Sequence, residues 1–70
     1  MEAQDFLFWM ERVGIKTGLD LEKTLGWSRV TAQKNLAAAK SGELVTLKVV
    51  DELAMSAIAQ GLKKWSDYDR

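Results

Sequence analysis

Side chains that can recognise a base edge or a phosphate gather between residues 28 and 40. The amide of Gln33 can form two hydrogen bonds with adenine, Lys34 can reach guanine or a phosphate, and Val30 can pack on a thymine methyl group. Ser28 and the first amides of a helix that starts there can hold a phosphate. The candidate DNA-binding residues are therefore Ser28, Arg29, Val30, Thr31, Gln33, Lys34, Ala37 and Lys40. The alternative is that these residues form the solvated face of an ordinary surface helix.

Two short helices joined at Gly26 would present these side chains. Leu21 and Leu25 lie four residues apart and can share one helical face, and Gly26 permits the positive φ of a tight turn. Ser28 can cap the next helix, which we expect at residues 28–40. Its predicted inward stripe consists of Ala32, Leu36 and Ala39. The polar residues then point outward, as in a helix-turn-helix whose second helix reads the major groove of DNA.

The rest of the chain is also predicted to be helical. Apolar spacing predicts a first helix at residues 3–13, ended by Gly14. Thr17 and Asp20 resemble a capping box that starts the second helix near residue 18. Thr46 is expected to cap a fourth helix.

The apolar pattern predicts which side chains these helices bury. The expected inner face of the fourth helix consists of Leu47, Val50, Leu53, Ala54, Ala57 and Ile58. The expected core consists of Phe6, Trp9, Leu21, Leu25, Leu36, Leu53 and Ile58. No alternating strand pattern of useful length occurs. We therefore expect an all-α fold, a compact bundle of four to five short helices in one domain spanning residues 1–70.

Composition argues against catalysis. The chain has no histidine and no cysteine, so it lacks the usual zinc ligands and the thiolate nucleophile. We expect no catalytic residue, no metal site, no cofactor and no small-molecule substrate. The formal charge is zero, but residues 23–50 hold five basic residues against one acid, which leaves +4 there and −4 elsewhere. The positive segment coincides with the predicted reading helix.

The motifs extend over nearly the whole chain. They are Phe6-Leu-Phe-Trp-Met-Glu-Arg-Val-Gly14, Thr17, the turn Leu25-Gly26-Trp-Ser-Arg29, Thr31, Leu36, and Ala59-Gln-Gly-Leu62 followed by Trp65. This layout resembles small Cro- and repressor-like helix-turn-helix proteins of phages and prophages. The resemblance implies a lambda-repressor-like bundle, binding to operator DNA as a dimer, and transcriptional regulation by repression.

The expected working unit is a homodimer, because one such domain covers only half of a turn-spaced palindrome. Candidate dimer contacts are Val49, Met55 and Trp65. No apolar run approaches the ~20 residues that span a bilayer, and residues 1–5 carry acid where a signal peptide carries base. We expect no membrane partner and a location in the cytoplasm of a bacterial or phage-infected cell.

A second function stays open. The same scaffold can serve as a protein-binding module, such as an antirepressor or a phage-encoded inhibitor of a host defence complex, because a fold does not fix a function. The neutral net charge favours this alternative somewhat. Salt-dependent binding to duplex DNA separates the two, since phosphate contacts weaken steeply with salt.

Overall fold

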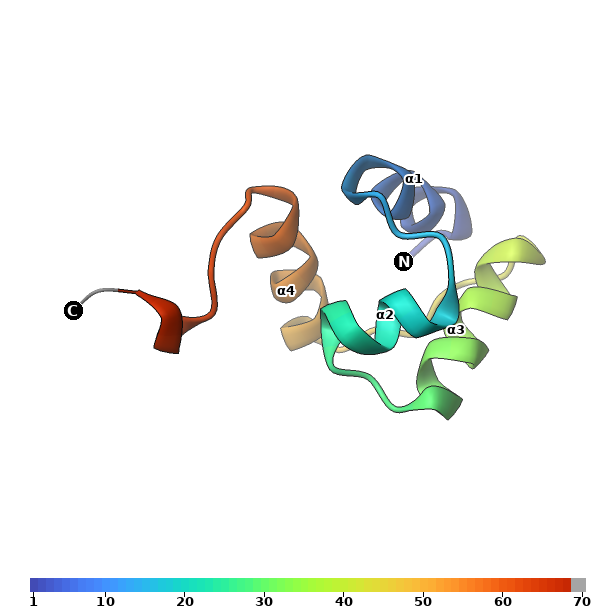
Figure 1. The fold of residues 1–70 in the computed structure, drawn as a ribbon. Coiled ribbons are helices and arrows are strands. Elements are labelled where there is room, and N and C mark those ends of the chain that lie inside the picture. The colour runs from blue at the N-terminus through green and yellow to red at the C-terminus, as the bar shows by residue number, and fades with distance from the viewer. Residues whose placement is uncertain (69–70) are drawn as a thin grey trace.

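Four α-helices and one short 3-10 turn follow one another along the chain in the computed structural model, which describes residues 1–68 (Figure 1). The elements are α1 (Ala3–Val13), α2 (Gly18–Leu25), α3 (Arg29–Lys40), α4 (Val49–Ala59) and the 3-10 turn η1 (Trp65–Asp67). Within residues 1–68 there is no strand. The all-α prediction is therefore confirmed, and the first three helices begin and end within a residue of where local sequence places them.

Local hydrogen bonds explain the boundary between α1 and α2. After α1, the Ile15 amide donates to the Met10 carbonyl at 2.8 Å, which turns the buried Ile15 side chain back toward the core. The capping box is confirmed, because the Asp20 amide donates to Thr17 Oγ1 at 3.1 Å and the Thr17 amide donates to Asp20 Oδ2 at 3.3 Å. A third bond, from the Lys16 amide to Asp20 Oδ2, is the main cause that lowers the pKa of Asp20.

Aromatic side chains form the centre of the core. Phe6 is fully buried, tilted against Trp9 with ring centroids 5.9 Å apart and stacked on Trp27 with centroids 6.1 Å apart. The buried core side chains are Ala3, Phe6, Trp9, Met10, Ile15, Leu21, Ala32, Ala39, Val45 and Met55. Of the other predicted core residues, Leu25, Leu36 and Ile58 are partly buried and pack against this cluster. The core thus draws on all four helices and on the segment between α3 and α4.

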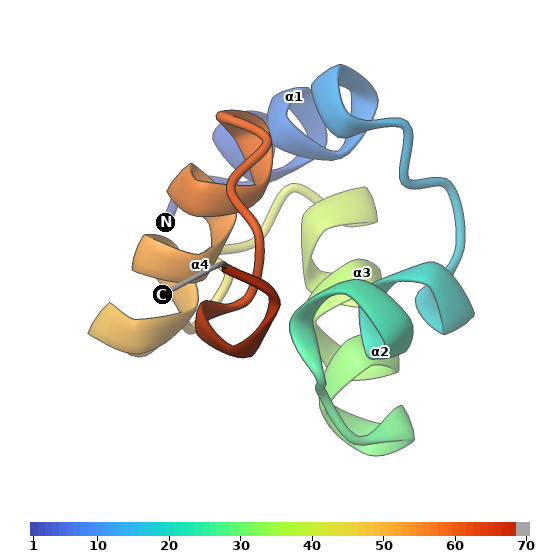
Figure 2. The same ribbon diagram turned by 60° about the vertical axis from the view of Figure 1, so that its left-hand side comes forward.

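The segment between α3 and α4 is tied to the start of the chain. The Val45 amide donates to the Met1 carbonyl at 2.8 Å, and the Met1 ammonium donates to the Val45 carbonyl at 3.0 Å. In Figure 2 this segment passes beneath α1 on its way from α3 to α4. The two bonds hold Val45 in place while its side chain enters the core.

The predicted start and orientation of α4 were wrong. The helix begins at Val49, and the residue that precedes it is Lys48 rather than Thr46. Asp51 Oδ2 accepts a hydrogen bond from the Lys48 amide at 3.0 Å and so caps the start of the helix. The buried Trp9 indole N–H donates to the Met55 carbonyl at 2.8 Å. With Met55 turned inward, Leu53 faces away from the core and is 64% exposed. Leu53 is therefore a surface residue, contrary to its predicted place in the core.

Beyond α4 the chain leaves the helical body. In Figure 1 the segment from Leu62 to η1 projects away from the four helices. Within it, the Tyr68 hydroxyl accepts the Lys63 amide at 3.2 Å, and the Trp65 and Tyr68 rings lie 6.1 Å apart. This segment has local order of its own while its apolar side chains stay largely exposed.

Candidate nucleic-acid interface

A tight turn joins α2 to α3. Gly26 adopts φ 71°, in the left-handed region that disfavours other residues, and its amide donates to the Glu22 carbonyl at 2.9 Å. Ser28 has extended backbone angles and caps α3, its Oγ accepting the Thr31 amide at 3.2 Å. The Ser28 hydroxyl also donates to Thr31 Oγ1 at 3.0 Å. Both predicted roles, the hinge at Gly26 and the cap at Ser28, are confirmed.

All eight candidate DNA-binding residues are exposed, and they lie on α3 or at its cap. Val30, Gln33, Lys34 and Ala37 follow the spacing of one helical stripe. Val30 is apolar, yet its side chain is 76% exposed, because it lies on the side of α3 opposite the buried face. These four therefore share the outer side of α3, while Arg29 and Lys40 lie at its edge, where each lines a hollow together with Leu36.

The inner face of α3 is built from small residues. Ala32 and Ala39 are buried, and Leu36 is partly buried against the core. Sequence reasoning missed Asn35, which is only 4% exposed. Its position three residues after Ala32 and four before Ala39 is the signal that could have placed it inward.

Trp27, in the turn before α3, connects that turn to α4. Its indole N–H donates to Asp51 Oδ1 at 3.1 Å, while its ring stacks on Phe6. Asp51 therefore accepts two hydrogen bonds, one from Trp27 and one from the Lys48 amide. Residue spacing gives no sign of this bond, because its two partners lie 24 positions apart. We call this arrangement the Trp27–Asp51 clamp.

Charge is distributed unevenly around α3. The helix carries Arg29, Lys34 and Lys40 and no acidic residue. On α2, the partly buried Glu22 lines a hollow of about 440 Å³ together with Arg29 and Gln33. A phosphate placed in this hollow would meet the Glu22 carboxylate. The more favourable positions for phosphate are therefore beside Lys34 and Lys40.

The first turn of α3 offers backbone donors as well. The first amides of an α-helix have no partner within the helix, and Ser28 satisfies only that of Thr31. The backbone amides of Arg29 and Val30 precede that of Thr31 and lie at the positive, N-terminal end of the helix dipole. This helix start is therefore suited to an anion at its N-terminus.

The three predicted dimer contacts do not share one surface character. Val49 and Trp65 are exposed, but Met55 is 2% exposed and belongs to the core. Met55 is therefore not available to a partner, because α4 packs with this residue toward the core. In that orientation Val50 and Leu53 are exposed beside Val49. We call these three residues the α4 apolar face.

Two other features, a cluster of metal ligands and a membrane-spanning helix, are absent from the part of the chain that the structure describes. Residues 1–68 contain no cluster of three or more carboxylate, histidine or cysteine side chains placed to hold a metal ion. No helix among them is long and apolar enough to cross a membrane. Comparison with protein-family models, curated proteins and solved structures gives no significant match for this chain.

Proposed function

We propose that this protein binds double-stranded DNA sequence-specifically, as a transcriptional regulator of the Cro and repressor type, with α3 in the major groove. The observation that carries the proposal is the set of exposed side chains on α3. They are the Gln33 amide, three basic side chains and the apolar Val30, and the helix carries no acidic residue. A major groove admits an α-helix and presents donors, acceptors and methyl groups to it. A helix with this exposed surface, capped at a tight turn, suits that groove.

Different side chains then have different tasks. Gln33 reads a base edge, and Val30 packs against a thymine methyl group. Lys34 and Lys40 neutralise phosphates, and the α3 N-terminus holds another. Glu22 opposes binding in its own hollow, so it limits affinity for every sequence alike.

Salt dependence tests the electrostatic part. If Lys34 and Lys40 each neutralise one phosphate, affinity falls with a log–log slope of about −1.8. From about 50 to about 200 mM salt, that slope predicts a loss of about 12-fold per bound chain. Fluorescence anisotropy on a random duplex measures it. A flat salt response would overturn the proposal and favour the protein-binding alternative.

Selection of bound sequences from a random duplex pool tests the reading part. Gln33→Ala should relax preference at one base pair by about 1 to 3 kcal/mol, whereas Lys34→Ala should weaken all sequences and lower the salt slope by about one. Lys63→Ala, in the exposed segment beyond α4, is the matched control and should change neither. If Gln33→Ala and Lys34→Ala bound every duplex like the parent, α3 would not be the reading element.

The same proposal includes a homodimer, with the α4 apolar face as its contact. Three neighbouring exposed apolar side chains on one helix favour burial against a second copy. A two-fold dimer places two reading helices about 34 Å apart, one helical turn of DNA. Leu53→Asp should sediment as a single chain in the absence of DNA, while Gln4→Asp, an exposed change on α1, should leave the dimer intact. A parent that stays monomeric with and without a palindromic duplex would refute the dimer.

A further inference from the structure

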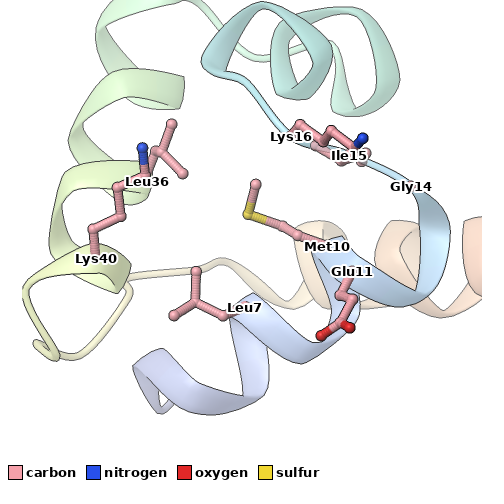
Figure 3. Close-up of a pocket in the computed structure, with 8 residues that line it drawn as sticks. All are labelled: Leu7, Met10, Glu11, Gly14, Ile15, Lys16, Leu36 and Lys40. Carbon is pink, nitrogen blue, oxygen red and sulfur yellow. The ribbon is translucent and has the colours of Figure 1, made fainter.

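A second hollow, distinct from the outer surface of α3, lies between α1, the residues after it, and the inner side of α3. Its volume is about 340 Å³. Leu7 and Met10 of α1 and Leu36 of α3 point toward its middle (Figure 3). Met10 and Ile15 are buried and make its floor, while Leu7 is more exposed at its mouth. An apolar hollow of this size lies at the lower end of the range for small-molecule sites.

Charged side chains stand around this apolar interior. Lys16, Lys40 and Glu11 belong to its lining and are exposed. In Figure 3 Lys40 lies with Leu36 on the α3 side of the hollow, whereas the Lys16 side chain runs back past Ile15, away from α3. Lys40 is therefore the cation on the α3 side of the rim, and the alkyl stem of a lysine extends an apolar wall while its charge stays in water.

We propose that this hollow binds a small amphipathic anion, with an apolar chain against Met10 and Leu36 and a carboxylate at Lys40. The apolar floor accounts for the chain, and the Lys40 ammonium favours an anionic head over a cationic one. A fatty-acid-like carboxylate has both properties. The site uses none of the base-reading side chains on α3.

Such a ligand would act on the proposed DNA surface through α3. Lys40 is shared between the hollow and the proposed phosphate contacts, so a carboxylate paired with it withdraws one cation from DNA. By linkage, the ligand and DNA then weaken each other's binding by the same factor. This consequence rests on the proposed function, whereas binding of the ligand does not.

Methyl NMR tests the site without DNA. Octanoate should shift the Met10 methyl signal saturably and leave that of Met55 unchanged, because Met55 lines a different hollow. Octylammonium, which has the same chain and the opposite charge, should bind at least about fivefold more weakly. An unmoved Met10 signal, equal shifts at Met55, or equal affinity for the two amphiphiles would overturn the proposal. Because no DNA is present, failure here is distinct from failure of the proposed function.

Variants assign the binding to named side chains. Lys40→Gln should weaken octanoate about twofold to fivefold, the range for one exposed charge pair, and leave 1-octanol unaffected. Lys34→Gln, exposed on α3 outside the hollow, is the matched control and should bind octanoate like the parent. Leu7→Trp should fill the hollow and abolish binding of both ligands. Should that variant unfold, Lys40→Gln still decides, since unchanged octanoate affinity in that variant would refute the proposed contact of the carboxylate with Lys40.

Discussion

Replacing Asp51 with alanine removes both acceptors of the Trp27–Asp51 clamp. The Lys48 amide loses its capping partner at 3.0 Å, and the Trp27 indole loses its partner at 3.1 Å. A lost helix cap costs about 1 kcal/mol, and a hydrogen bond to a charged group contributes about 1.5 to 3 kcal/mol. Since Trp27 is only partly buried and water can reach its vicinity, the lower end applies to the second term. We expect Asp51→Ala to cost about 2 to 3 kcal/mol.

That loss is large for this chain. A core of 70 residues rarely supplies more than about 3 to 5 kcal/mol of net stability. Asp51→Ala should therefore lower the urea midpoint strongly, as followed by far-UV circular dichroism, which does not depend on tryptophan fluorescence. Glu52→Ala is the matched control, an exposed carboxylate one residue along α4, and should change stability by less than about 0.5 kcal/mol.

A double-mutant cycle with Trp27→Phe isolates the bond itself. Phenylalanine retains an aromatic ring to stack on Phe6 and lacks the indole N–H. If the bond contributes as argued, the two losses should fail to add by about 1 to 1.5 kcal/mol. A coupling energy below about 0.3 kcal/mol would refute the reasoning, because independent sites add within that margin.

Three further predictions concern α2 and its ends. Gly26→Ala should destabilise the folded state by about 1 to 2 kcal/mol. The whole cost is backbone strain at φ 71°, because an added Cβ meets nothing within 4 Å. A urea midpoint equal to the parent's would contradict this. Gly18→Ala should stabilise by about 0.5 to 1 kcal/mol, since its Cβ would reach Gln33 Cγ at an ordinary 3.7 Å, and a lower melting temperature would show that α2 cannot accept it. The pKa of the Asp20 carboxyl is lowered in the folded state, so the stability that this group contributes is complete above its unfolded pKa and disappears as pH falls through its folded pKa. Asp20→Asn should therefore make the stability less sensitive to acid. Urea midpoints measured from neutral to acid pH check this.

Local signals explain why three of the four helices were predictable. The ends of α2 and the start of α3 depend on bonds between residues three or four apart, such as those of Thr17 with Asp20 and of Ser28 with Thr31. The burial of Ala32 follows from helical spacing alone. The exposure of the candidate DNA-binding residues follows from the same spacing, because the opposite side of α3 is the apolar one.

The orientation of α4 could not be predicted in this way. It is fixed by the indole of Trp9, which bonds the Met55 carbonyl 46 residues away, and by Trp27, which bonds Asp51. The sequence of α4 is apolar on several sides, so periodicity alone places Leu53 inward as readily as Met55. The burial of Met55, one of the three predicted dimer contacts, could not be predicted for the same reason.

The alanines on the inner side of α3 determine how DNA-binding variants should be interpreted. Ala32 and Ala39 allow close approach of α3 to the core but bury little apolar area, at about 0.8 kcal/mol per buried CH₂. The position of α3 therefore depends on its cap at Ser28 and on the clamp at the turn before it, and neither contact involves Gln33 or Lys34. Substitutions of exposed residues on that surface should change stability by less than about 0.5 kcal/mol. A loss of DNA affinity in Gln33→Ala or Lys34→Ala would thus report a lost contact rather than an unfolded domain.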